Sequence, residues 1–498
     1  MFSTSLRVFV IYALTTLLQT ANAATPNEWR SRSIYQIFTD RFARTDEFNT
    51  YCVPGYRGFC GGTWQGITNK LDYIQGMGFT AIWISPVVQN VADSARAYHG
   101  YSATNLYGLN SNFGTAGDLK ALAKALQSRG MYLMVDVVAN HFGYDGSAYD
   151  VDYSTLNPFN QREHFHVNPI CFIEDYANQI EVEQCWIGDG DYPLPDVNTT
   201  HPTVREGFSD WLKWFIPEYS IDGLRVDTVK HVEKPFWPIF NYASNVYNLG
   251  EVLDGNIQYF CPYQNYMDGL FAYPIYFQIT QFFSDPSATS ANLVRAIGDM
   301  TSECKDTTLL GSFSENHDQA RFANYTQDMA LARNIIAYTM IADGIPVIYQ
   351  GQEQHFSGGA DPYDREALWT SNYDTDSPLY NFVKQMNAIR SMSFTKSSSY
   401  LAWKQTVTYS DGHIIAIRKG EANSMTLMVT NNLGEGAADY NLNMPNAGFA
   451  TRLKVVELLS CREVNVDQRG GLDVQIISGL PSIYYPQYLL PGTGWCGY

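Results

Sequence analysis

The sequence predicts an α/β fold: an eight-stranded parallel barrel with intervening helices, followed by a small all-β domain. From about residue 34 to about residue 400, short apolar runs typical of buried strands alternate with helical patterns. After about residue 403 the pattern changes to alternating apolar and polar residues separated by turns. Strands alternating with helices favour a barrel over an open sheet, and the later alternation indicates a separate β domain.

The individual elements follow from these patterns. The expected barrel strands lie at 34–38, 81–85, 132–138, 223–226, 246–249, 269–271, 309–312 and 346–349. The clearest helices lie at 117–129, 204–214 and 329–343. Strands of the later domain are expected at 407–409, 414–418, 425–429, 453–459 and 474–477.

One connection departs from this pattern. Between Asn140 and Asp196 no clear helix appears, and the stretch contains two Cys, many acidic residues and a PLPD turn. Because so long a connection is unusual in a compact domain, we expect an inserted subdomain after the third strand. The expected organisation is a barrel at 24–140 and 198–402, an inserted subdomain B at 141–197 and the β domain at 403–498.

Residues 1–23 are typical of a secretory signal peptide. Arg7 supplies the charge, 8–18 form the apolar run, and Ala21, Asn22 and Ala23 form the small-residue cleavage site. A disordered or membrane-anchoring start is the alternative, but the apolar run is short for a bilayer span. No other long apolar segment follows, and the chain ends without the hydrophobic tail of a lipid-anchor signal. The sequence therefore predicts a secreted protein without a membrane anchor.

The composition limits the possible partners. With 45% hydrophobic and 16% charged residues, the chain is typical of a globular protein. Its formal charge of −18 argues against nucleic acid or an anionic membrane, because phosphates would be repelled. A neutral polymer or a cation remains compatible, and we expect a monomer.

Eight cysteines, an even number, indicate an oxidising compartment and disulfide bonds. Zinc binding is the alternative, but the sequence has no Cys-X-X-Cys pair. Two Asn-X-Thr strings, at Asn198 and Asn324, are candidate glycosylation sites.

Three acidic residues follow predicted strands: Asp227, Glu251 and Asp318. In a parallel barrel the carboxyl ends of the strands converge on one face, where active sites are built. Three carboxylates meeting there fit cleavage of a glycosidic bond, which needs one acid and one nucleophile or base. The alternative is that each is a capping or ion-pair residue, and their joint placement favours the catalytic interpretation.

Longer strings around these residues resemble the α-amylase superfamily, and within it the secreted fungal α-amylases. The strings are DVVANH at 136–141, GLRVDTVKH at 223–231, GEVLD at 250–254 and ENHD at 315–318, supported by YQIFTDRF at 35–42, GGTWQG at 61–66 and GQE at 351–353. The resemblance extends over nearly all of the chain after the signal. It implies a (β/α)8 TIM barrel, a calcium-binding insertion and a C-terminal antiparallel β-sandwich. The implied activity is retaining, endo-acting hydrolysis of internal α-1,4 bonds in starch-like or glycogen-like polymers.

The resemblance also implies roles for individual residues. Asp227 would be the nucleophile that forms a covalent glycosyl–enzyme, Glu251 the acid and then the base, and Asp318 a ligand of sugar hydroxyls. Arg225 would keep the nucleophile ionised and oriented, and Tyr101 would stack under the sugar ring. The other implied substrate-binding residues are His141, Lys230, His231, His317, Asp361 and Arg365.

The implied calcium ligands are Asn140, Glu183, Asp196 and the backbone carbonyl of His231, hard oxygen donors that suit Ca²⁺. The ion would hold the insertion against the barrel. The implied disulfides join Cys52 to Cys60, Cys171 to Cys185, Cys261 to Cys304 and Cys461 to Cys496.

The chain departs from the family pattern at 99–105. The family commonly reads HGYWxxD, whereas this chain reads HGYSATN, so that Ser102 replaces a stacking Trp and Asn105 an Asp. We expect weaker binding on the non-reducing side of the cleaved bond, unless a neighbouring aromatic side chain fills the position.

Two alternatives to the hydrolase remain. A 4-α-glucanotransferase or a cell-wall α-glucan-processing enzyme would use the same catalytic residues, with a sugar hydroxyl in place of water. A non-catalytic glucan-binding relative would usually lack one of the three carboxylates, all of which are present here.

Overall fold

The structure is a computed structural model that describes residues 24–46, 48 and 50–498. The predicted signal peptide at 1–23 lies outside these residues. None of the helices in the described part of the chain combines the length and apolar character needed to cross a membrane.

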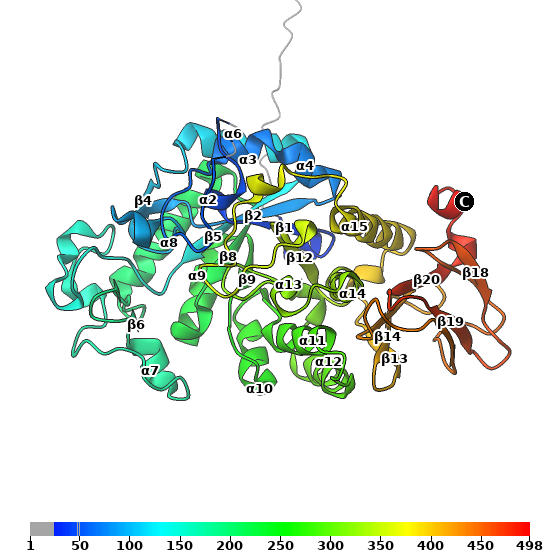
Figure 1. The fold of residues 1–498 in the computed structure, drawn as a ribbon. Coiled ribbons are helices and arrows are strands. Elements are labelled where there is room, and N and C mark those ends of the chain that lie inside the picture. Colours follow the sequence, from blue (N-terminus) through cyan, green and yellow to red (C-terminus); the bar gives the residue numbers. More distant parts are fainter. Residues whose placement is uncertain (1–23, 47, 49) are drawn as a thin grey trace, which may run out of the picture.

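Eight parallel strands form the central sheet, in the order β10-β9-β8-β5-β2-β1-β12-β11 (Figure 1). A parallel bridge between Phe271 and Gly311 joins the two ends of this order, so the sheet closes into a barrel. The predicted barrel is therefore confirmed. Its strands are β1 (Ile34–Ile37), β2 (Ala81–Ile84), β5 (Tyr132–Val138), β8 (Gly223–Asp227), β9 (Tyr247–Gly250), β10 (Gly269–Leu270), β11 (Gly311–Phe313) and β12 (Ile345–Tyr349).

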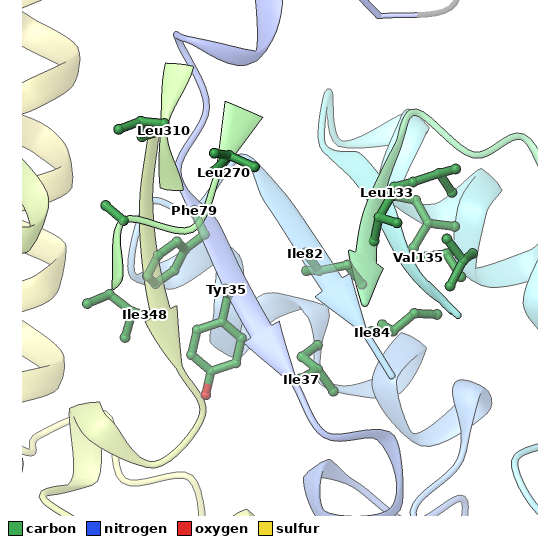
Figure 2. Packing of buried hydrophobic residues seen from close by; sticks show 14 of the residues in the cluster. Tyr35, Ile37, Phe79, Ile82, Ile84, Leu133, Val135, Leu270, Leu310 and Ile348 are labelled. Carbon is green, nitrogen blue, oxygen red and sulfur yellow. The ribbon is translucent and has the colours of Figure 1, made fainter. Parts of the chain in front are cut away.

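Side chains at alternate positions of the barrel strands enter two different clusters. Tyr35 and Ile37 of β1 and Ile82 of β2 belong to the large cluster shared with the surrounding helices (Figure 2). Ile34 of β1 and Trp83 of β2 belong to a second cluster inside the barrel. Burial on both faces explains the continuous apolar runs in the sequence, and the inward positions carry the polar residues described below.

The helices around the barrel include those expected. Helix α8 begins with a proline at its first position and continues to Tyr219, past the predicted end at 214, because Phe215, Ile216 and Tyr219 extend its buried face. The helices are α1 (Pro26–Trp29), α2 (Thr39–Phe42), α3 (Trp64–Asn69), α4 (Leu71–Gly76), α5 (Ser94–Ala97), α6 (Ala116–Ser128), α7 (Gln179–Gln184), α8 (Pro202–Tyr219), α9 (Trp237–Ser244), α10 (Ile257–Phe260), α11 (Tyr273–Ser284), α12 (Ala291–Glu303), α13 (Phe322–Tyr325), α14 (Met329–Ile341) and α15 (Pro378–Lys396).

The segment between β5 and α8 has little regular structure, as the sequence predicted. It contains the short helix α7, three 3-10 turns and the two-residue strands β6 (Ile187–Gly188) and β7 (Pro193–Leu194). A bridge between His141 and Asp196 joins the two ends of the segment beside the barrel. The hairpin of β3 (Val88–Asn90) and β4 (Ala103–Leu109) was not predicted.

The C-terminal part is antiparallel, as predicted. One six-stranded sheet has the order β13-β14-β15-β20-β17-β18, and β16 pairs with β19 in a second sheet. These strands enclose a hydrophobic core of their own. Their bounds are β13 (Thr406–Ser410), β14 (Ile414–Lys419), β15 (Thr426–Asn431), β16 (Tyr440–Met444), β17 (Lys454–Glu457), β18 (Arg462–Asn465), β19 (Leu472–Ile476) and β20 (Ser482–Pro486).

All eight cysteines are paired, and no described cysteine is free. The pairing is the one that the resemblance implied: Cys52–Cys60, Cys171–Cys185, Cys261–Cys304 and Cys461–Cys496. We expect that titration of the denatured, unreduced protein with a thiol reagent detects no thiol. Reduction before the same titration should release all eight, and two or more reactive thiols without reduction would contradict this pairing.

Candidate active site

The alternation of the barrel strands places the polar residues of the candidate site. Arg225 and Asp227 lie two residues apart on β8, on the same inward face. Asp136 of β5 is the register partner of Arg225 on the neighbouring strand. Glu251 follows the last residue of β9, the next strand of the sheet. The predicted convergence of carboxylates at the carboxyl ends of the strands is therefore seen for Asp227 and Glu251, and Arg225 and Asp136 lie beside them.

Arg225 and Thr228 hold Asp227 and Glu251 next to each other. The guanidinium of Arg225 donates from Nη1 to Asp227 Oδ1 over 2.6 Å and approaches Glu251 Oε2 with Nη2 at 2.9 Å. The hydroxyl of Thr228 donates to Asp227 Oδ2 over 3.0 Å, and its backbone N–H donates to Glu251 Oε2 over 3.2 Å. Thr228 has a φ of 49°, a strained conformation for a β-branched residue, of the kind that occurs at functional sites.

Burial and charge act on Asp227 and Asp136 in opposite directions. Asp227 and Glu251 are 7% and 8% exposed. Burial raises the pKa of Asp227, and the neighbouring Arg225 guanidinium opposes this rise. Burial also raises the pKa of Asp136 to about 6, again opposed by Arg225. The arginine is thus the group that favours the charged form of both aspartates.

Asp318 lies on a second arginine-centred cluster. Arg365 donates to Asp318 Oδ1 over 3.2 Å and pairs with Asp361 Oδ1 at 2.8 Å. The backbone carbonyl of His317 accepts from Arg365 Nε over 2.9 Å. The structure therefore brings together the predicted residues Asp318, Asp361, Arg365 and His317.

Tyr101 and two histidines complete the inner part of the site. The ring of Tyr101 stacks on that of His317 with centroids 5.4 Å apart, and its hydroxyl donates to Asp136 Oδ2 over 2.7 Å. His141 Nε2 lies 3.9 Å from Asp227 Oδ2. Burial lowers the pKa of His141 to about 4 and that of His317 well below its usual range. Both histidines are therefore neutral at neutral pH and suited to hydrogen bonds with uncharged partners.

A cavity of about 430 Å³ opens beside Glu251. Lys230 and His231 line it, together with Tyr176 from the segment between β5 and α8. The ammonium of Lys230 donates to the carbonyl of Leu253 over 2.8 Å and lies 5.2 Å from the ring centre of Tyr176. These contacts place Lys230 and His231 next to Glu251.

Three of the four predicted calcium ligands converge. One end of the Asn140 side-chain amide lies 2.9 Å from the carbonyl oxygen of His231 and 3.0 Å from Asp196 Oδ1. Both neighbours are hydrogen-bond acceptors, so the amide nitrogen of Asn140 faces them and donates to both. Turned the other way, the amide oxygen would form with them a set of three oxygens suited to a hard cation. Glu183, on α7, accepts instead from Gln179 Nε2 over 2.7 Å. Clusters of three or more His, Cys, Asp or Glu side chains that suit a metal are absent from the described residues.

Comparison with known proteins identifies the family. The model for the alpha-amylase catalytic domain matches residues 36–404, and that for alpha-amylase domain C matches 407–498. The chain belongs to the α-amylase family. Alpha-amylase 1 of Schwanniomyces occidentalis is 47% identical over 478 residues, which cover 95% of this chain and 93% of that protein.

Solved α-amylase structures agree. The alpha-amylase from Malbranchea cinnamomea has a TM-score of 0.92 at 46% identity, over 95% of this chain and all of that one. An alpha-amylase from Geobacillus thermoleovorans, solved with acarbose, has a TM-score of 0.79 at 29% identity, over 92% and 98%. The protein is therefore an α-amylase-type glycoside hydrolase.

Ser102, which stands where the α-amylase pattern has Trp, is not surrounded by empty space. Ser102 is 2% exposed, and its backbone N–H donates to Asn90 Oδ1 over 2.8 Å. A Cβ atom added at Gly143 would lie only 2.5 Å from Cβ of Ser102, so the two backbones are in close contact. Asn105 bonds to Gln89 and Asn157. The backbone of Gly143, rather than a neighbouring aromatic side chain, thus packs against this position.

We therefore expect Ser102→Trp to give no gain in kcat/KM on maltotetraose or on starch. The larger side chain should instead destabilise the protein by about 1–3 kcal/mol, because the site is already packed. Kinetics on both substrates and denaturant unfolding measure these effects, with Ser102→Ala as the control that keeps wild-type behaviour. A gain on the short substrate that exceeds the gain on starch would contradict this view.

Three contributors to the α-amylase site were not predicted from the sequence. Asp136 is the first residue of the string DVVANH at 136–141. A charged residue at an inward position of an otherwise apolar strand is the pattern that could have identified it. Tyr273, after β10, donates to Glu251 Oε1 over 3.2 Å. Tyr176 has no local signal, because only the fold brings its segment to the cavity.

Proposed function

We propose that the protein is a secreted, retaining, endo-acting hydrolase of internal α-1,4-glucosidic bonds in starch-like or glycogen-like polymers. The observation that carries this proposal is the pair of carboxylates, Asp227 and Glu251, held by the same guanidinium at the carboxyl ends of adjacent strands. The Geobacillus alpha-amylase, which was solved in complex with acarbose, supports an α-glucan substrate. Retention of the anomeric configuration needs the two carboxyl groups about 5–5.5 Å apart, so that one attacks the anomeric carbon while the other transfers a proton.

In the proposed first step, Asp227 attacks the anomeric carbon while Glu251 donates its proton to the leaving glycosidic oxygen. The carbon–oxygen bond of the substrate breaks, and an ester bond to Asp227 forms. In the second step Glu251, now ionised, takes a proton from water, and the water oxygen displaces Asp227. Arg225 favours the ionised form of Asp227 and fixes its orientation.

The remaining predicted residues are proposed to bind the substrate. Asp318, held by Arg365, would accept from sugar hydroxyls and help to distort the ring, and Asp361 would extend this contact. His141 and His317, neutral because they are buried, would hydrogen-bond to hydroxyl groups, and Tyr101 would stack on the ring. The cavity lined by Lys230 and His231 would receive the product side of the chain.

We also propose that Asn140, Asp196, the carbonyl of His231 and Glu183 hold Ca²⁺. The convergence of Asn140, Asp196 and the His231 carbonyl supports this assignment, whereas the Asn140 amide must turn its oxygen toward the ion and Glu183 must turn from Gln179. A bound Ca²⁺ would supply positive charge that links β5, the following segment and the 3-10 turn η4 (Val229–His231). The role is structural, because these residues support His141 and Lys230 rather than the reacting bond.

Removing calcium is expected to lower the melting temperature first and the activity second. A ligand present at a hundredfold excess over its Kd stabilises the native state by about 2.7 kcal/mol, which chelation would remove. The measurement is a thermal melt after exhaustive dialysis against chelator, with added Ca²⁺ restoring the transition. An unchanged melting temperature would count against the site.

Secretion is supported by the four disulfides and by the signal at 1–23. We propose that Asn198 and Asn324 carry glycans and that the protein is a monomer without a membrane anchor. Asn324 is exposed, and Asn198 is half-buried.

Product analysis tests the proposed function. With maltoheptaose and soluble starch, hydrolysis should release shorter maltooligosaccharides, and the first product should carry the α configuration by NMR. Products longer than maltoheptaose would favour a glucanotransferase. No change in either substrate would favour a non-catalytic relative.

A further inference from the structure

A second cavity, of about 540 Å³, lies between the barrel helices and the C-terminal sheets. Helices α14 and α15 contribute one side, and strands β17 to β20 the other; α15 lies beside the C-terminal strands in Figure 1. Its volume is within the ~300–1,000 Å³ range of small-molecule sites. None of its lining residues belongs to the proposed active site, so any ligand here would be bound independently of catalysis.

Two arginines without ion pairs face this cavity, Arg333 from α14 and Arg462 from β18. Among the described residues neither lies within ion-pair distance of a carboxylate. The Nε atom of Arg333 is buried without a hydrogen-bond partner. Arg462 makes only long contacts, at 3.4 Å to the carbonyl of Asp473 and 3.4 Å to the Tyr484 hydroxyl. Guanidinium groups with free donors are suited to phosphate and carboxylate oxygens.

One acidic residue, Glu457, also lines the cavity, but its carboxylate is already engaged. Oε1 accepts from the backbone N–H groups of Leu459 over 3.2 Å and Ile483 over 3.0 Å. Oε2 accepts from the backbone N–H and the hydroxyl of Ser460 over 2.7 and 2.6 Å. The carboxylate thus stabilises its own turn and leaves the two guanidiniums available, so the lining carries net positive charge on a chain with a net charge of −18.

The rest of the lining suits the body of a sugar. Phe382 provides aromatic surface, Tyr484 lies behind the lining with no exposed area, and Gln385 and Gln475 provide amides. Ser482 is 5% exposed, and its hydroxyl interacts with the side chain of Tyr484. Pyranose rings combine an apolar face with hydroxyl groups, and this combination of aromatic and amide groups satisfies both. Apolar lining with a few placed polar groups is typical of small-molecule sites.

We propose that this cavity is a binding site for a saccharide of one or two rings that carries an oxyanion. The oxyanion is held by Arg333 and Arg462, and the sugar ring lies against Phe382 with its hydroxyl groups toward the amides of Gln385 and Gln475. Sugar phosphates and uronic acids share this chemistry, as does a phosphate-bearing unit of a glucan chain.

Calorimetric titration of the full-length protein at low salt tests the proposal, with glucose 6-phosphate and glucuronate as the two anionic probes. At least one should bind at least tenfold more tightly than glucose or inorganic phosphate alone. The probe that binds more tightly shows whether the site prefers a phosphate or a carboxylate. Affinity should fall as salt is added, because the contact is between charges.

Variants assign the binding to this cavity. The double variant Arg333→Gln, Arg462→Gln should bind the anionic probe at least tenfold more weakly than the wild type. Replacing both arginines by Lys should give an intermediate loss of affinity. Arg469→Gln is the matched control, because Arg469 is an exposed arginine of the same domain outside the cavity. Thermal melts verify that each variant is folded, and activity on starch should remain unchanged in all of them.

Three results would overturn the proposal. They are no binding of either anionic probe, equal binding of glucose, and unchanged binding in the double Gln variant. Equal binding of glucose would indicate a neutral-sugar site, and unchanged binding would place the ligand elsewhere on the protein.

Discussion

Glu251→Gln and Asp227→Asn are each expected to lower kcat on starch by about 10²–10⁴-fold or more, the usual contribution of a positioned acid–base group. Both substitutions keep the shape of the side chain and remove its charge. Each should leave the fold intact, because Arg225 still binds the remaining carboxylate and Asp136. Steady-state kinetics and circular dichroism measure the two effects.

A second substrate separates the two roles. An aryl maltotrioside whose leaving group is an acidic phenol needs no proton from the enzyme, so Glu251→Gln should still release the phenol in a first turnover. Asp227→Asn should not, because it lacks the nucleophile. Asp210→Asn, an exposed carboxylate that pairs with Lys213 at 3.6 Å, serves as the matched control. Activity on starch within threefold of wild type in either site variant would contradict the assignment.

The second large effect is expected on stability. Lys419 of β14 forms a buried ion pair with Asp343, which follows α14, at 2.6 Å, and both side chains are 4% exposed. Asp343 also accepts from Thr307 and from the backbone of Gln405, and Lys419 donates to the carbonyl of Trp403. Lys419→Met would leave the Asp343 carboxylate buried without its cation, which typically costs about 3–5 kcal/mol.

Denaturant unfolding of the wild type and Lys419→Met measures this loss. The matched control is Lys454→Met, because Lys454 pairs with Glu463 at 3.2 Å on the surface, where such pairs contribute about 0–1 kcal/mol. Adding Asp343→Leu to Lys419→Met should recover much of the stability, since no unpaired charge then remains. Equal midpoints for Lys419→Met and Lys454→Met would show that the buried pair does not hold the C-terminal sheet to the barrel.

The barrel strands were predicted well because their apolar runs are buried on both faces. Tyr132–Val138 was predicted with its observed bounds. Three strands of the C-terminal part were not predicted: Tyr440–Met444, Arg462–Asn465 and Ser482–Pro486. Tyr440–Met444 alternates apolar and polar residues but is largely exposed, whereas Ser482–Pro486 is buried throughout and shows no period of two.

The same distinction applies to the site. The carboxylates at 227, 251 and 318 were predicted because strand ends converge in a parallel barrel, and the disulfides, histidines and calcium ligands were inferred from family motifs. No local pattern indicated that Tyr273 bonds to Glu251 or that Tyr176 reaches the cavity beside it.

By itself, the sequence determined the order and type of the barrel elements and the residues at the strand ends, because burial and strand geometry act over a few neighbouring residues. The tertiary structure alone decided which charges are neutralised and which side chains are enclosed. Arg225 is shared by Asp136, Asp227 and Glu251, whereas Ser102 is enclosed by Gly143. These contacts join segments that lie far apart in the chain. The packing of the whole fold determines the distances between such segments, and a local sequence pattern does not indicate them.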